Sequence, residues 1–418
     1  MRQLYFCFPF RGVGGVPILF LRVAEHIAAA GLAKCYLIDY VDGYMAINRD
    51  PSITELIEYN DISKVHIPKN SSIVFQSITP WSMFPNLDIH ASAKVLFWNC
   101  HPLNLIPSLP GFRTVTSRDT MFSKLVLNTV LINFTKKVRE FLTYLLDKNA
   151  IVFMDGTNLQ VTCDFLDISI KNPNFLPIPV KPLSNNNFSR SKIGDGVIRF
   201  IWVGRIVDFK YYPLKRFLKD LSEIATKSET KFELIIVGDG EYIDSLRKEA
   251  LKPKYKLLNI TFIKYIDYKN LDAFIMKNAD ILIGMGTSAL EGAKLGVPTL
   301  LFDFSYIDIL GAYKYRWVHE SNNFNLAEMI GMKNSNLSGD TLREKVDEFQ
   351  TYHDQISLKD FEYYLENHEI SAVVSKLINF LDKTKCEYGK LKLSGFFSRG
   401  FLYSSFYATR KLLRSNKR

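Results

Sequence analysis

The sequence predicts an α/β protein built from two successive domains, and three observations support this. Short apolar runs typical of buried strands alternate with amphipathic helical stretches along most of the chain. The length of 418 residues exceeds the usual size of one domain. A polar stretch rich in Asn and Ser, LSNNNFSRSKIGDG at 183–196, interrupts the alternation near its middle. We therefore expect a Rossmann-like domain over 1–182, a linker over 183–196, a second Rossmann-like domain over 197–385 and a basic, aromatic tail over 386–418.

Each expected element has a local reason in the sequence. Short runs of β-branched, aromatic and leucine residues predict buried strands at 4–9, 35–39, 72–76, 95–98, 150–154, 197–203, 232–237, 260–263 and 281–283. Apolar residues recurring every three or four positions predict helices at 18–30, 121–146, 213–225, 242–251 and 271–278, with helical structure over 321–381. The proline-rich FLPIPVKP at 175–182 is incompatible with a helix or a central strand.

The positive charge is concentrated at one end of the chain. Of a net charge of +10, ten basic residues and one acidic residue fall within 383–418, so the rest of the chain is nearly neutral. This argues against a nucleic-acid-binding body, which would carry a basic face on the fold itself. The tail mixes basic with aromatic residues, which suits either an anionic membrane surface or a final helix packed on the N-terminal domain. These residues are Phe396, Phe397, Phe401, Phe406, Tyr407, Arg399, Arg410, Lys411, Arg414 and Arg418.

The five cysteines are scattered without a C-x-x-C pair, which argues against a zinc site or a disulfide framework and fits a reducing cytosol. No run approaches the 18 to 20 apolar residues that a membrane-spanning helix needs. We expect a cytoplasmic protein that can associate peripherally with the cytoplasmic face of the inner membrane.

The segment ADILIGMGTSALEGAKLGVP (279–298) predicts a ligand site. It places a Gly-Met-Gly-Thr-Ser turn between a buried strand and a helix expected to begin near Ala289. The two glycines allow a ligand close to the backbone, and the helix N-terminus suits a phosphate. A carboxylate in the first helical turn could accept hydrogen bonds from ribose hydroxyls. The candidate residues are Gly284, Gly286, Thr287, Ser288 and Glu291; the alternative is an ordinary strand–turn–helix connection.

Two further motifs follow strands of the second half. In VGRIVDFK (203–210), Gly204 is followed by Arg205 and Lys210, two cations that could hold a diphosphate at the carboxyl edge of the sheet. The alternative is a pair of solvated loop cations. VGDGE (237–241) is chiefly a turn and a helix entry.

The first half offers two weaker candidates. Gly14 and Gly15 belong to a glycine-rich loop between the first strand and the first helix, which either approaches a bound phosphate or sugar or forms a plain tight turn. His101 follows the strand at 95–98 and could contact a sugar hydroxyl or transfer a proton. The alternative for His101 is a role in stabilising its loop.

The chain resembles glycosyltransferase family 4, as a divergent member. The resemblance rests on GGVPILFLRVAEHIAAAG, VGRIVDFK, VGDGE and NADILIGMGTSALEGAKLGVPTL in this order, and it covers roughly residues 1–320. It implies the GT-B fold, two Rossmann-like domains with parallel sheets facing across a cleft. It also implies an enzyme of the hexosyltransferase type that retains anomeric configuration.

The resemblance assigns roles to single positions. Arg205 and Lys210 match the pair that holds the donor diphosphate, and Glu291 matches the second glutamate of the E-x7-E motif, which binds ribose. Gly14 and Gly15 match the glycine loop near the diphosphate and sugar, and His101 resembles the strand-end histidine near the donor sugar.

The first glutamate of E-x7-E is missing, because Ile283 occupies its position. Since that glutamate contacts the donor sugar in the family, its loss affects the identity of the sugar and, in one reading, activity itself.

We expect a glycosyltransferase of cell-surface polysaccharide biosynthesis (O-antigen, capsule or lipopolysaccharide), with a UDP- or GDP-sugar donor and a glycan or lipid-linked acceptor. No cofactor or metal is expected, and no D-x-D pair occurs. The alternatives are a non-catalytic GT-B scaffold that binds a nucleotide or a partner glycosyltransferase, and a GT-B sugar-nucleotide epimerase.

Overall fold

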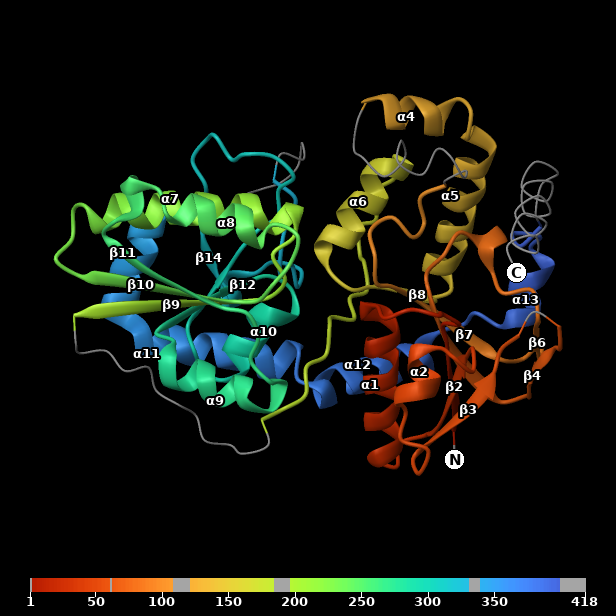
Figure 1. The fold of residues 1–418 in the computed structure, drawn as a ribbon. Helices are drawn as coiled ribbons and strands as arrows, with labels where there is room; N and C mark the ends of the chain where they lie inside the picture. Colours follow the sequence, from red (N-terminus) through yellow and green to blue (C-terminus); the bar gives the residue numbers. More distant parts are fainter. Residues whose placement is uncertain (1, 61, 108–120, 184–195, 331–338, 399–418) are drawn as a thin grey trace, which may run out of the picture. The chain divides into compact units, whose positions relative to one another are not determined.

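The computed structural model describes residues 2–60, 62–107, 121–183, 196–330 and 339–398, and it divides into two compact units (Figure 1). Unit 1 comprises residues 1–176 together with 374–418, and unit 2 comprises residues 177–373. Each unit contains its own six-stranded, largely parallel sheet, so the α/β prediction with two Rossmann-like domains is confirmed. The predicted linker at 183–196 lies almost wholly outside the described residues.

The sheet of unit 1 has the strand order β3-β2-β1-β5-β7-β8, and all its pairs are parallel. Its strands are β1 (Gln3–Cys7), β2 (Lys34–Asp39), β3 (Thr54–Glu58), β5 (Ser71–Gln76), β7 (Lys94–Asn99) and β8 (Ile151–Phe153). A separate two-stranded sheet pairs β4 (Val65–Ile67) with β6 (Leu87–Ile89). The helices include α1 (Gly15–Ala29), α2 (Tyr44–Asn48), α4 (Met121–Asn128), α5 (Ile132–Asp147) and α6 (Gly156–Leu166), with a 3-10 turn η1 (Pro80–Ser82).

The sheet of unit 2 repeats this plan in the order β11-β10-β9-β12-β13-β14, with only the last pair antiparallel. Its strands are β9 (Val197–Val203), β10 (Lys231–Val237), β11 (Leu258–Ile263), β12 (Ile281–Gly284), β13 (Thr299–Leu301) and β14 (Arg316–Trp317). The helices are α7 (Asp208–Ala225), α8 (Ile243–Ala250), α9 (Tyr268–Asn278), α10 (Thr287–Lys294) and α11 (Leu342–Asn367), with 3-10 turns η2 (Pro253–Tyr255) and η3 (Val318–Glu320). Helices α7 and α8 lie on one face of this sheet and α9 and α10 on the other (Figure 1).

Three sequence predictions differ from the structure. The single helix expected over 121–146 is divided into α4 and α5, because Leu131 leaves the helical conformation. The helical region expected over 321–381 contains helices only from Leu342 among the described residues. The strands β3, β4, β6, β13 and β14 were not predicted, because each is short or lacks a long apolar run.

The C-terminal part of the described chain returns to unit 1 within α12 (Ile370–Lys383), so residues 374–385 belong there rather than to the second domain as expected. The reason is a set of backbone and hydroxyl contacts to the first sheet. Thr384 Oγ1 donates to the carbonyl oxygen of Val95 at 3.1 Å, and the Cys386 carbonyl accepts from the Val95 amide at 2.9 Å. The helix α13 (Tyr388–Leu393) follows, and Leu391 is fully buried.

A buried ion pair stabilises the edge of the second sheet. Arg316 donates to both carboxylate oxygens of Asp303 at 2.9 and 2.7 Å, and both side chains are almost completely buried. Asp303 also accepts from the amide of Glu328 at 2.7 Å and from the Tyr313 hydroxyl at 3.3 Å. The pair therefore links β13 and β14 to the segment around Glu328.

We predict that Asp303→Ala lowers the free energy of unfolding by about 3 to 5 kcal/mol, because it leaves the Arg316 charge buried without a partner. Urea denaturation followed by tryptophan fluorescence measures this loss. The matched control is Glu223→Ala, which removes an exposed pair with Lys219 at 3.8 Å and should leave the midpoint almost unchanged. Equal midpoints for the two variants would contradict the importance of the buried pair.

Candidate functional site

The loops that follow β9 and β10 touch each other through their backbones. The Gly204 amide donates to the Val237 carbonyl at 3.0 Å. A Cβ atom on Gly238 would lie 2.1 Å from the Gly204 carbonyl oxygen, and one on Gly240 would lie 2.4 Å from the Ile206 carbonyl oxygen. Gly238 and Gly240 also have φ angles of 150° and 149°, which favour glycine. The VGDG motif therefore serves to position the loop that carries Arg205.

Arg205 and Lys210 lie close together at the carboxyl end of β9. Arg205 is exposed, whereas Lys210 is half-buried, with Nζ 5.6 Å from the centroid of the Trp202 ring and 5.9 Å from that of Phe209. Burial lowers the pKa of Lys210, and the positive charge of Arg205 lowers it further. Within the described part of the chain, neither side chain pairs with a carboxylate in a salt bridge. Two neighbouring cations that make no salt bridge within the described residues form a site suited to an anion, although the carboxylates of Asp208 and Glu241 line the same pocket.

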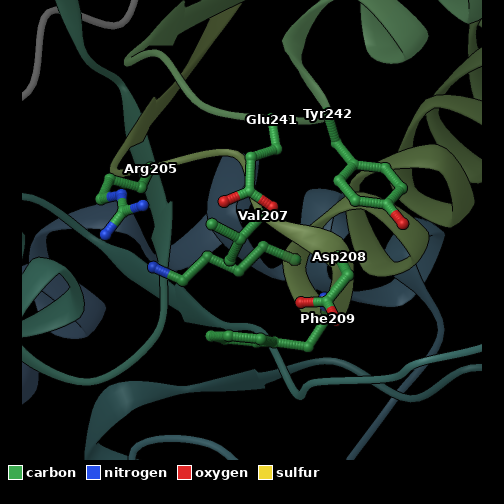
Figure 2. A pocket seen from close by; sticks show the side chains of 7 residues that line it. Arg205, Val207, Asp208, Phe209, Glu241 and Tyr242 are labelled. Atoms are coloured by element: carbon green, nitrogen blue, oxygen red, sulfur yellow. The ribbon is translucent and has the colours of Figure 1, made fainter. Parts of the chain in front are cut away.

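A pocket of about 490 Å³ opens at these two side chains, and all its lining residues come from unit 2 (Figure 2). Figure 2 shows the Glu241 carboxylate pointing toward the middle of the pocket, between Arg205 and Tyr242, with the Phe209 ring along the opposite wall. The lining residues are Arg205, Val207, Asp208, Phe209, Lys210, Glu241 and Tyr242.

Sequence reasoning identified Arg205 and Lys210 but missed the other walls of the pocket. Glu241 and Tyr242 directly follow the Gly-Asp-Gly turn after β10. Because β10 lies beside β9 in the sheet, recognition of this strand order would have placed the two residues beside the loop after β9. Gly204 lies next to the pocket, since a Cβ atom there would be 3.4 Å from Lys210 Nζ.

The turn between β12 and α10 does not line this pocket. Helix α10 begins at Thr287, two residues earlier than predicted, so Glu291 lies in the second turn of the helix and its predicted place in the first turn is wrong. The reason is that Gly286 is the N-cap, with a φ angle of 60°. Its amide donates to the Leu326 carbonyl at 3.0 Å, so this N–H group already has a partner.

The hydroxyl groups of this turn differ in availability. Ser288 Oγ donates to the Met285 carbonyl at 2.9 Å and accepts from the Met285 amide at 3.3 Å, so it closes the turn. Thr287 is exposed at the start of the helix. A Cβ atom on Gly284 would lie 2.9 Å from Ser288 Oγ, which explains why the strand ends in glycine.

Glu291 is held by a buried lysine. Lys294 Nζ, almost completely buried, contacts Glu291 Oε2 and also pairs with Asp272 Oδ1 on α9 at 3.0 Å. Burial alone would lower the pKa of Lys294, but the two carboxylates outweigh it and raise this pKa. The Glu291 side chain is 15 % exposed, so it remains reachable from solvent.

Ile283, at the position of the missing glutamate, is fully buried in the apolar core of unit 2 with Trp202 and Phe302. It pairs in register with Trp202 on β9 and Leu300 on β13. Position 283 is therefore part of the hydrophobic core, and its side chain is not accessible to a ligand.

The candidates of the first half all lie in unit 1. Gly14 is the N-cap of α1 with extended backbone, and Gly15 is its first residue, where a Cβ atom would meet nothing within 4 Å. His101 is exposed, and its Nδ1 accepts a hydrogen bond from the Leu103 amide at 3.2 Å. This contact matches the loop-stabilising alternative.

Three acidic side chains among the described residues lie close enough together to suggest a metal site. Oxygen atoms of Glu320, Asp340 and Glu348 lie within 4.8 Å of one another. The ammonium group of Lys345, almost completely buried, already contacts all three, at 2.7, 3.0 and 3.1 Å. This group is therefore a structural ion cluster.

Comparisons with known proteins agree with the fold. Residues 184–330 match the family model described as Glycosyl transferases group 1. A glycosyltransferase from Rickettsia africae has a similar structure with 15 % identity, over 91 % of this chain and 98 % of the other, at a TM-score of 0.53. The N-terminal domain of trehalose-6-phosphate phosphatase from Candida albicans has 13 % identity over 91 % and 97 %, at a TM-score of 0.50. No curated protein sequence matches the chain.

At these identities the structural matches speak for the fold alone. They confirm the predicted GT-B fold. The family model confirms a resemblance to glycosyltransferases over residues 184–330, but not to family 4 in particular. The chain therefore has the α/β fold of GT-B glycosyltransferases, and its residues 184–330 match the glycosyl transferases of group 1.

Proposed function

We propose that the protein transfers a sugar from a nucleotide-diphosphate donor, and that Arg205 and Lys210 hold the donor diphosphate. The observation that carries this proposal is a pair of neighbouring cations without a carboxylate partner, at the carboxyl edge of a Rossmann-like sheet. The match of this unit to group 1 glycosyl transferases supports the same reading.

The mechanism follows from where charge develops. Breaking the bond between sugar and phosphate leaves negative charge on the departing diphosphate. Arg205 and Lys210 stabilise that charge, and fixed charges prepared before the reaction are often the largest contribution to catalysis. The half-buried setting of Lys210 strengthens the interaction, since the local dielectric constant is lower than in water. This role needs no metal ion, and we propose a metal-independent reaction with retention and without a cofactor.

The remaining donor contacts are proposed from where the residues lie at the turn between β12 and α10. The exposed Thr287 hydroxyl and the N-terminus of α10 could receive phosphate oxygens, with Gly284 and Gly286 allowing close approach. Ser288 contributes by closing this turn rather than through a free hydroxyl. Glu291 receives the ribose hydroxyls in this proposal, while Lys294 fixes one of its two oxygens. Gly14, Gly15 and His101 keep, as proposals, the roles near the donor that the sequence resemblance gives them.

The acceptor is proposed to be a glycan or lipid-linked oligosaccharide of cell-surface polysaccharide synthesis, at the cytoplasmic face of the inner membrane. The described chain contains no helix long and apolar enough to cross a membrane. The basic, aromatic tail is the proposed contact to anionic lipid, and residues 399–418 lie outside the described residues. Phe396 and Phe397 are described: Phe396 packs on Phe141 of α5, as the reading of a tail packed on the N-terminal domain predicted, whereas Phe397 packs on Tyr388 within the tail itself.

The first prediction concerns the donor. In a thermal-shift panel of UDP, GDP, ADP, CMP and their common sugar conjugates, we expect one nucleotide class to raise the melting temperature of the wild type. Arg205→Ala should abolish the shift, because it removes one of the two cations. Arg343→Ala, an exposed arginine on α11 outside the pocket, is the matched control and should keep it. No shift with any nucleotide would refute the donor site.

The second prediction concerns pH. A diphosphate binds the protonated form of Lys210, so affinity is present below the pKa of this lysine and is lost as the pH rises through it. Because burial lowers that pKa, the loss should begin at a lower pH than the value near 10.4 of an exposed lysine. Isothermal titration calorimetry over a pH series measures it, and Lys210→Arg should remove the dependence. The same pH profile in both proteins would exclude Lys210 as the titrating group.

A scaffold without catalysis remains the second candidate, because Ile283 replaces the sugar-contacting glutamate with a core residue. When the nucleotide class identified by the panel is supplied as its sugar conjugate with acceptor lipid, we expect the sugar to be joined to the acceptor and the nucleoside diphosphate to be released over time. Tight nucleotide binding without turnover, across a panel of sugars and acceptors, would instead favour the scaffold.

The last prediction of the proposed function concerns the tail. Vesicle flotation should show weaker binding for a chain that ends at Ser398 than for the full chain, because the truncation removes six basic residues. The truncation must not extend to Asp382, since Thr384, Cys386 and Leu391 are buried in unit 1. Equal flotation of the two chains would remove the tail from the membrane proposal.

A further inference from the structure

Helix α4 and the start of α5 expose a group of apolar side chains in unit 1. Phe122 and Leu125 on α4 are 60 % and 58 % exposed, and Val130 and Ile132 are 66 % and 45 % exposed. These four residues fall within eleven consecutive positions, and we refer to them as the α4–α5 face. Phe122 and Leu125 are three residues apart on one helix, so their side chains lie on the same side.

The exposure is not a sign that α4 is detached from the fold. Ser123, Val126 and Leu127 of the same helix are buried, and the Leu131 amide donates to the Val126 carbonyl at 2.9 Å. Helix α4 therefore packs one side against unit 1 and presents the other side to solvent, across the end of α5 (Figure 1). Neighbouring exposed apolar side chains of this size mark an interaction surface.

The charge around this face indicates the chemistry of its partner. Residues 121–140 contain four basic residues, Lys124, Lys136, Lys137 and Arg139, and one acidic residue, Glu140. Lys136 is exposed one helical turn after Ile132. A face that combines large apolar side chains with an excess of basic residues complements an anionic, partly apolar surface, which is the character of a bilayer with acidic phospholipid.

The C-terminal chain packs on α5, on a different side of this helix from Ile132. The Phe396 ring packs on Phe141 and Tyr144 of α5, with centroid separations of 5.5 and 5.7 Å. Two residues later, the carbonyl oxygen and Oγ of Ser398 accept hydrogen bonds from Lys137 Nζ at 2.7 and 2.8 Å. The chain thus runs along α5 toward its N-terminal end, and it reaches the level of Lys137, about 7.5 Å along the helix axis and about 140° around it from Ile132.

The following residues, 399–418, contain six basic and no acidic side chains. Since this segment and the α4–α5 face carry charge of the same sign, the tail is a poor candidate for covering the face itself. Both would instead be attracted to the same anionic surface.

We propose that the α4–α5 face docks on a bilayer containing anionic phospholipid, with Phe122, Leu125, Val130 and Ile132 entering the boundary between headgroups and acyl chains. Lys136 then lies at the level of the lipid phosphates. This proposal does not depend on the donor site in unit 2. Two weak contacts joined in one chain bind far more tightly than either alone, so the face and the tail reinforce each other.

The test is co-sedimentation of the full-length protein with vesicles of phosphatidylglycerol and phosphatidylcholine. Replacing two apolar side chains, Phe122→Ser with Leu125→Ser, should lower the partition coefficient by about tenfold or more. Ile307→Ser with Leu310→Ser is the matched control, because these side chains are 72 % and 90 % exposed in unit 2. The control should sediment as the wild type does, and pure phosphatidylcholine vesicles should bind the wild type weakly.

Further measurements separate the outcomes. Lys136→Glu changes one exposed charge without altering the apolar side chains, and it should weaken binding to anionic vesicles only. An unchanged urea midpoint shows that each variant is folded. Wild-type binding by both the Phe122/Leu125 and the Lys136 variants would overturn the proposal, leaving the tail as the membrane contact. A dimer in solution that these substitutions dissociate would also overturn it, since the face would then bind a second copy of the chain.

Discussion

The site in unit 2 depends on the close approach of two backbone loops at the carboxyl edge of the sheet. The loop after β10 lies against the loop after β9 so tightly that Gly238 and Gly240 have no room for a side chain. Both glycines also adopt φ angles that other residues rarely take. This contact fixes the path of the chain from Gly204 to Asp208, and it thereby places Arg205 and Lys210 at the same pocket as Glu241 and Tyr242.

Electrostatics distinguishes Lys210 from the two other inward-facing lysines of unit 2. Lys294 is surrounded by two carboxylates and Lys345 by three, and in both cases these partners outweigh the effect of burial and raise the lysine pKa. Lys210 makes no salt bridge within the described residues, and burial, with a further effect of the Arg205 charge, lowers its pKa. A partly buried charge without a salt-bridge partner costs stability. In the proposed function an anionic ligand pairs with this charge, so the arrangement that is costly in the free protein would favour binding.

The sequence predicted the parts of the fold that follow from local pattern. Buried parallel strands such as β8 (IVF) and β12 (ILIG) are continuous apolar runs, and the loops after β9 and β12 were recognised by their glycines and cations. Contacts between distant segments were not predictable from one sequence. Lys294, which holds Glu291, also pairs with Asp272. This pair joins two helices, α9 and α10, whose packing depends on the whole sheet. The start of α10 was misplaced because Thr287 and Ser288 were assigned to the turn, whereas the N-cap is Gly286 with a positive φ.

Ile283 shows how a site can change while its fold remains. The residue sits at the end of β12, in register with Trp202 and Leu300, and its side chain fills the core beside Phe302. A carboxylate there would need a partner or an opening to solvent, because an ionised group buried among aromatic rings is costly. Gly286, the N-cap of α10, stands in open space, whereas the space beside Gly284 is taken by Ser288. In the proposed function the turn and the Arg205–Lys210 pair recognise phosphate through the backbone and fixed charge, which does not require a carboxylate at 283. On that proposal anion binding and sugar recognition are separable, and the donor sugar is selected by side chains other than the one at 283.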